Sequence, residues 1–171
     1  MDLREAILDR RSIRAFGDRP VDVDAVEALK EAVLWAPSAG NLQSRAFWFV
    51  THEHTRALLG KASYQAEIFE SAPLVVVGCA DAAIEAEYGE RGRALYALQD
   101  VAAAVQNLLL TAHAHDLGAV WIGAFDPDAV RAALDLPEAL EPIAMIPVGT
   151  PAESPSAPEH KSSRELFHDV D

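Results

Sequence analysis

The segment Ala36-Pro37-Ser38-Ala39-Gly40-Asn41-Leu42-Gln43 bears most directly on the fold of this chain. It follows a helix predicted over 24–35, which Pro37 should end because proline disfavours helical backbone in the residue before it. Residues 46–51 are aromatic and β-branched, as expected of a strand. The segment is therefore a loop between a helix and a strand. Its small residues would let a flat ring approach the backbone, and its Asn and Gln offer donors and acceptors to a heterocycle edge. Taken alone, it also fits an ordinary turn.

A second segment, Arg10-Arg11-Ser12-Ile13-Arg14, gathers positive charge near the end of a short helix that Asp2 is expected to cap. Five of the 14 basic residues fall within the first 19 positions of this acidic chain. Guanidinium groups bind phosphate oxygens bidentately and stay charged when partly buried. The cluster therefore suggests a site for a small anion. Ordinary surface ion pairs with neighbouring carboxylates are the alternative; the candidates are Asp2, Glu5, Asp9 and Asp18.

The rest of the chain alternates helical and strand patterns, which indicates one α+β domain over 1–171. An apolar run after Pro73, LVVVGCA, predicts a strand that is buried on both faces. Three prolines mark 151–171 as an extended C-terminal arm. The other predicted elements are mostly helix over 53–70, a polar, mobile excursion over 81–93, a long helix over 94–115 closed by Gly118, a short strand over 120–123, a helix from Asp126 to about Leu134 and a strand over 143–149.

Composition limits the class of protein and its partners. With 171 residues the chain can bury one substantial core, and its formal net charge of −13 opposes binding to nucleic acid or to anionic membranes. No apolar run approaches the roughly 20 residues that cross a bilayer, and the N-terminus lacks the apolar region of a signal peptide. The single cysteine, Cys79, lies in the apolar run and is expected to be a buried, inert thiol. A reducing, cytoplasmic location is therefore expected.

Several common catalytic signatures are absent from the sequence. It contains no G-x-G-x-x-G, no H-E-x-x-H and no G-x-S-x-G. Gly118 and Gly123 have the spacing of a phosphate-binding loop, but Ala124 and Phe125 follow in place of Lys and Ser or Thr. The histidines do not form a metal-ligand pattern. A hydrolase, a metalloenzyme and a dinucleotide-binding domain of the usual type therefore have little support, and no metal is expected.

A third segment, GAVWIGAF over 118–125, fits a buried strand when it is taken alone. Together and in this order, however, the segments RRSIRAF, APSAGNLQ, QDVAAAVQNLLL, WIGAFD and PVGTP resemble the FMN-dependent nitroreductase family. The resemblance covers nearly the whole chain. It implies an α+β fold with a mainly antiparallel central sheet flanked by helices, and a homodimer with non-covalent FMN in a cleft between the subunits.

The resemblance also implies which residues contact the flavin. The phosphate and ribityl chain would be held by Arg10, Arg11, Ser12 and Arg14. The loop that packs on the ring from the other subunit would contribute Pro37, Ser38, Ala39 and Asn41. Three residues would lie near the ring, namely Gln65, Gly123 and Ala124, and a C-terminal basic pair, Lys161 and Arg164, would reach the phosphate.

The activity implied by this resemblance is electron transfer from NADH or NADPH to a small electron-poor acceptor, such as a nitroaromatic or a quinone, by a ping-pong mechanism. No side chain is required as an acid or base, because the flavin carries the chemistry. The alternatives are a related flavoenzyme with a dedicated substrate (enone reduction, dehalogenation or flavin reduction) and a non-catalytic FMN-binding module. The excursion over 81–93 and the C-terminus are both shorter than in larger members, and Gly123 stands where some members have an acidic residue.

Overall fold

The computed structural model describes residues 1–170, and a four-stranded antiparallel sheet lies at its centre. The strand order is β1-β2-β4-β3, so β2 and β4 occupy the middle. The strands are β1 (Arg45–Val50), β2 (Leu74–Asp81), β3 (Gly118–Ala119) and β4 (Leu140–Gly149). The predicted α+β class and the antiparallel sheet are confirmed.

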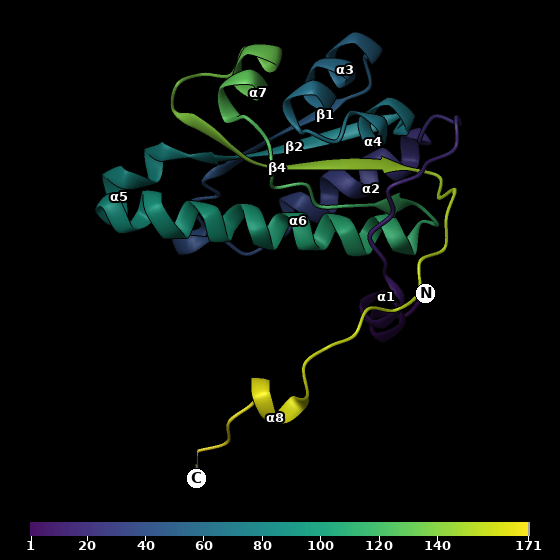
Figure 1. Cartoon of the computed structure of the whole chain (residues 1–171). Helices are drawn as coiled ribbons and strands as arrows, with labels where there is room; N and C mark the ends of the chain where they lie inside the picture. The colour runs from purple at the N-terminus through teal and green to yellow at the C-terminus, as the bar shows by residue number, and fades with distance from the viewer. Residues whose placement is uncertain (171) are drawn as a thin grey trace.

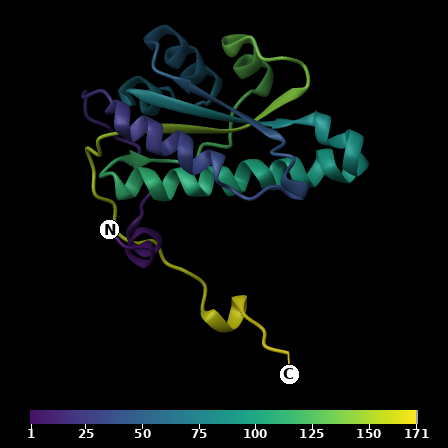
Figure 2. The same ribbon diagram turned by 180° about the vertical axis from the view of Figure 1, so that it is seen from behind.

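Helices cover both faces of this sheet (Figure 1, Figure 2). On one face lie α2 (Val23–Leu34) and the long α6 (Ala97–Ala114), while the other face carries α3 (Glu53–Ala62), α4 (Ala66–Ser71) and α7 (Pro127–Leu134). Alternate residues of β2 point to opposite faces, so Val76 joins the α2/α6 core while Val75 and Val77 join the other. This arrangement explains why β2 reads as a continuous apolar run although its neighbours are antiparallel.

The two ends of the chain project from this layered body (Figure 1). Helix α1 (Leu3–Asp9) begins with a capping box between Asp2 and Glu5 and leaves Leu3 70% exposed. The arm leaves the body after residue 150 and is fastened there by backbone hydrogen bonds from Gly17 N to Thr150 O and from Ala152 N to Ala15 O. Every residue over 156–170 is exposed, including those of the short α8 (Ser163–Leu166).

The excursion predicted as mobile over 81–93 is helical, so that prediction is wrong. It consists of a 3₁₀ turn η2 (Ala82–Ile84), α5 (Glu85–Arg91) and a π turn η3 (Gly92–Tyr96), which leads directly into α6. Ile84 is only 2% exposed and anchors this otherwise polar stretch in the core. A positive φ of 61° at Gly89 provides the kink inside α5. The long helix consequently starts at Ala97 rather than at residue 94.

Gly118 does not close the long helix as predicted. Helix α6 ends at Ala114, and Asp116 takes the left-handed conformation after it, with φ 58°. Gly118 instead begins β3, where a Cβ would lie only 2.7 Å from the Cβ of Ile13. The glycine is therefore needed for close packing between the first segment of the chain and the sheet. The strand predicted over 120–123 is also wrong: beyond Ala119 the chain keeps a hydrogen bond from the Val120 N–H to the Pro147 carbonyl and an isolated bridge between Ile122 and Met145, but it forms no continuous strand.

Candidate functional site

The arginine-rich segment lies directly beside β3. Ser12 forms a parallel bridge with Ala119, and the N–H of Ile13 donates to the Ala119 carbonyl at 3.1 Å. Gly123 and Ala124 follow Ile122, which bridges to Met145 on the same edge of β4 that pairs with β3, and both are exposed. The structure thus brings two of the predicted groups, 10–14 and 123–124, to one edge of the sheet.

The arginines of this segment are free of ion pairs. Within residues 1–170 the salt bridges are Lys30–Glu27 and Arg93–Glu85, so none of the five N-terminal arginines pairs with a carboxylate. The alternative of ordinary surface pairs is therefore not what the structure shows. Arg14 is exposed, whereas Arg11 turns back and donates to the carbonyls of Leu8 (2.8 Å) and Arg10 (3.0 Å) at the end of α1. Arg10, Ser12 and Arg14 are consequently freer to bind a ligand than Arg11.

Gln65 lies in a turn that is tied to the chain after Ala124. It is half-buried and precedes α4, in a turn where Tyr64 has φ 57°. The N–H of Asp126 donates to the Ala62 carbonyl at 2.9 Å, which ties this turn to the segment that follows Ala124. This hydrogen bond joins the chain just before Gln65 to the chain just after Ala124.

The loop over 36–44 has an unusual backbone. Three of its residues have positive φ, namely Gly40 (54°), Asn41 (57°) and Gln43 (54°). Left-handed conformations cost about 1–2 kcal/mol at a non-glycine residue, so surrounding contacts must hold them. The loop is also exposed at Pro37, Gly40, Asn41 and Gln43. It therefore presents a fixed surface outward rather than packing into its own chain.

Three side chains that the sequence interpretation missed hold this loop from behind. The Asp100 carboxylate, on α6, accepts from the N–H groups of Ala39 (2.9 Å) and Ser44 (3.3 Å). The Tyr88 hydroxyl lies against Gly40, in the space that a Cβ would occupy. The third, the Arg45 guanidinium on β1, donates to carbonyls at the end of α2 and the start of the loop: Val33, Leu34, Ala36 and Pro37.

Burial lowers the pKa of Arg45, while the neighbouring negative charge of Asp100 raises it. The sequence did contain a signal for Asp100, because this acidic residue interrupts a buried helix face that contains Ala97, Val101 and Ala104. No local pattern could indicate which backbone groups it binds.

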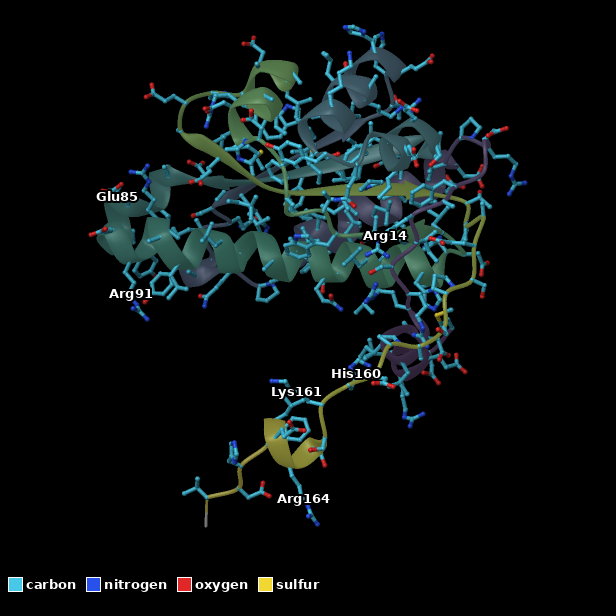
Figure 3. All side chains as sticks on the ribbon, viewed as in Figure 1. Arg14, Glu85, Arg91, His160, Lys161 and Arg164 are labelled. Carbon is cyan, nitrogen blue, oxygen red and sulfur yellow. The ribbon has the colours of Figure 1, made fainter. Side chains whose placement is uncertain are left out.

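The loop and the arginine-rich segment lie at opposite ends of α6. Asp100 holds the loop near the start of the helix, while His113 near its end lines a cavity of about 270 Å³ with Arg10 and Arg11. These helix positions are 13 residues apart, or about 20 Å at the rise of an α-helix. In Figure 3, Arg14 lies toward the C-terminal end of α6, whereas Arg91 of α5 lies near the start of α6. A single chain therefore does not bring the two segments together.

The C-terminal basic pair is also apart from the arginine-rich segment. Lys161 and Arg164 lie on the C-terminal arm, far from Arg14, and both side chains are exposed (Figure 3). At its start, the arm does contact the segment, because the Glu153 carboxylate accepts from the N–H groups of Arg14 and Ala15. Within one chain, then, the arm leads away from the predicted phosphate site.

Other kinds of reactive centre are not found in the part of the chain that the structure describes. Residues 1–170 contain no group of three or more His, Cys, Asp or Glu side chains placed to hold a metal ion. None of their helices is both long and apolar enough to cross a membrane. Cys79 is fully buried, as predicted, and burial raises the pKa of its thiol to about 12. The thiol therefore stays protonated and is no nucleophile at neutral pH.

Known proteins similar to this chain share both its sequence and its fold. The model of the nitroreductase family matches residues 7–81 and 60–150. An NADH dehydrogenase of Thermus thermophilus is 32% identical, covering 94% of this chain and 92% of the relative. An NADPH-dependent oxidoreductase of Staphylococcus aureus is 28% identical over 83% of this chain and 62% of its own length. The solved structure of nitroreductase A from Vibrio parahaemolyticus is 27% identical, with a TM-score of 0.90 over 98% of this chain and 75% of that one. The family match, the 32% identity and the shared fold together establish that the chain belongs to the nitroreductase family of oxidoreductases.

Proposed function

We propose that this chain binds FMN without a covalent bond, between two identical subunits, and transfers electrons from NADH or NADPH to a small electron-poor acceptor such as a nitroaromatic or a quinone. The names of its relatives support the reaction class, since they include an NADH dehydrogenase, an NADPH-dependent oxidoreductase and a nitroreductase. The whole chain, 1–171, would form one flavin-binding domain with a C-terminal arm. A cytoplasmic location also stays a prediction.

The observation that carries this proposal is the edge of the sheet where unpaired arginines lie beside exposed backbone. Arg10 and Arg14 have no carboxylate partner within residues 1–170, and Ser12 is bridged to Ala119 of β3. Cations that are free of ion pairs suit a phosphate, and open backbone at Gly123 and Ala124 suits a flat ring. The residues present therefore fit FMN.

Bound there, FMN would supply the hydride and electron chemistry between the nucleotide and the acceptor. The chain's own groups would bind and orient. Arg10, Ser12 and Arg14 would hold the phosphate and ribityl chain, and backbone N–H groups near Gly123 and Ala124 would orient the reactive edge of the ring. The Gln65 amide would hydrogen-bond the pyrimidine side of the ring.

The remaining predicted contacts would come from a second subunit. The proposed contacts of this loop are made by Pro37, Ser38, Ala39 and Asn41. Asp100, which holds the loop, and His113, which lines a cavity with Arg10 and Arg11, lie about 20 Å apart along α6. A partner chain therefore supplies the loop residues more simply than the same chain does. Large apolar side chains are exposed around the loop: Leu34 by 62%, Trp35 by 77% and Leu42 by 46%. Exposed apolar groups in one region favour a subunit contact there. The arm, with Lys161 and Arg164, would likewise reach the phosphate in the assembled dimer.

The test starts from the purified protein and its visible absorption spectrum. We expect a yellow protein with one FMN per subunit, and tighter binding of FMN than of riboflavin, because several residues are aimed at the phosphate. Anaerobic stopped-flow mixing with NADH and with NADPH should bleach the flavin absorbance, and a panel of nitroaromatics, quinones, enones and free flavins should restore it. The panel separates a general reductase from an enzyme with one dedicated substrate.

Three results would count against parts of this proposal. Failure of the protein to take up FMN would overturn the proposed cofactor. Equal affinities for riboflavin and FMN would overturn the assignment of the phosphate site. Tight FMN binding without bleaching by either nucleotide would indicate a non-catalytic flavin-binding module.

A further inference from the structure

One buried carboxylate, that of Asp100, joins the two ends of the strained loop over 38–44. Asp100 is only 3% exposed, and its two oxygens accept from two different backbone N–H groups, Ala39 before the left-handed residues and Ser44 after them. Gly40, Asn41 and Gln43, which have the positive φ angles, all lie between these two attachment points. The carboxylate therefore bridges the two ends of the loop.

Other contacts in the loop do not replace this bridge. The Ser38 hydroxyl accepts from the N–H of Gln43 at 3.1 Å, and the N–H groups of Asn41 and Leu42 donate to the carbonyls of Ser38 and Ala39. These hydrogen bonds stay within the loop. Two further contacts reach it from the body: the Ser44 carbonyl accepts from the N–H of Asp81 at 3.1 Å, and the Tyr88 hydroxyl lies against Gly40. Each touches the loop at one point only, so neither joins its two ends. Arg45 fixes the end of α2 and the start of the loop, because the carbonyls that it binds there, from Val33 to Pro37, all precede Ser38.

We infer that Asp100 is a positioning residue for the flavin site: it holds the Ser38–Ser44 loop of its own subunit in the backbone conformation that meets the flavin bound by the partner. This inference rests on the proposed function. The physical reason is pre-organisation, because a loop already fixed in the bound conformation loses less conformational entropy when the ligand arrives. A strained loop that is released instead relaxes and must be reordered on binding.

The test is the Asp100→Asn variant of the full-length protein. Asparagine keeps the size of the side chain and one acceptor oxygen, but its amide N–H₂ must then face the N–H of either Ala39 or Ser44. One of the two attachments is therefore lost. We expect amide hydrogen exchange over 38–44 to accelerate in the flavin-free protein, and the dissociation constant for FMN to rise roughly tenfold or more. The visible circular dichroism of any bound flavin should also change.

Two control variants separate positioning from general effects. Asp126→Asn also removes one negative charge, but Asn can still accept from the N–H groups of Asp128 and Ala129 through its single oxygen, as Asp126 does. Val130→Ala opens a cavity in the core on the opposite face of the sheet and lowers stability without touching the loop. Both controls should keep the wild-type dissociation constant for FMN and the wild-type exchange over 38–44.

Each outcome decides the inference. Fast exchange over 38–44 together with weakened FMN binding in Asp100→Asn, and in neither control, supports it. Unchanged exchange overturns it, as does fast exchange with unchanged FMN affinity, or an equal loss of affinity in Val130→Ala. If the wild-type protein takes up no FMN, the proposed function fails, and the exchange experiment alone then decides whether Asp100 holds the loop.

Discussion

Replacing Arg14 with alanine is expected to weaken FMN binding by about ten- to a hundredfold. A hydrogen bond to a charged group contributes about 1.5–3 kcal/mol, and each 1.4 kcal/mol is a factor of ten in affinity. Arg14 is exposed and makes no ion pair within the described chain, so its loss should change the stability of the flavin-free protein little. Fluorescence quenching of FMN during titration with each variant measures the effect.

Riboflavin and a neighbouring arginine provide the controls for this experiment. The affinity for riboflavin, which lacks the phosphate, should be nearly the same in wild type and Arg14→Ala. Arg19→Ala removes another exposed, unpaired arginine outside the 10–14 segment and should leave FMN binding as in wild type. Arg164→Ala should weaken FMN binding as Arg14→Ala does, if the arm reaches the phosphate. Unaltered affinity in both would make these arginines ordinary surface residues.

A mixed dimer is expected to recover flavin binding that two defective homodimers have lost. In the proposed architecture one site combines the 10–14 segment of one subunit with the 38–44 loop of the other. Arg14→Ala and Asn41→Ala homodimers would each carry one defect in both sites. A dimer with one subunit of each kind carries both defects in one site and none in the other. It should bind close to half an equivalent of FMN per subunit with wild-type affinity.

Co-expression with two different affinity tags gives the mixed dimer, and flavin absorbance per subunit gives the stoichiometry. Flavin should also strengthen dimerisation, because a ligand that bridges two chains stabilises their association by mass action. A protein that is monomeric by light scattering and still binds FMN tightly would contradict both this prediction and the two-subunit site. Failure of the mixed dimer to gain any binding would contradict the assignment of the two segments to different subunits.

The elements that the sequence predicted well are those whose information is local. Asp126 caps α7 through the N–H groups of Asp128 and Ala129, with Pro127 in the first turn, as the pattern indicated. The apolar run of β2 is long and uninterrupted, so its burial on both faces followed from composition alone. Such signals need no knowledge of the tertiary structure.

The predictions that failed depend on contacts between distant residues. A glycine after a helix usually closes it, but Gly118, in β3, packs closely against Ile13. Asp116 closes α6 in its place. The polar composition over 81–93 suggested mobility, yet Ile84 inserts into the core and orders the stretch. The same limit applies to the site. The types of the site residues could be predicted from motifs. The hydrogen bonds between Asp100 and the loop could not, because they join positions about 60 residues apart in the chain.

The way in which α6 and α7 end has a practical consequence for engineering heat resistance. Asp116 and Asp135 adopt left-handed conformations there, with φ 58° and 50°, and each places a negative charge at the negative end of a helix dipole. Both features are unfavourable, so changing either residue to glycine should raise the unfolding free energy by about 1 kcal/mol. For a chain of this size that corresponds to an increase in Tm of roughly 2–4 °C, measurable by calorimetry. Neither position lies among the residues assigned to the flavin, so thermal tolerance can be increased in this protein without altering its site.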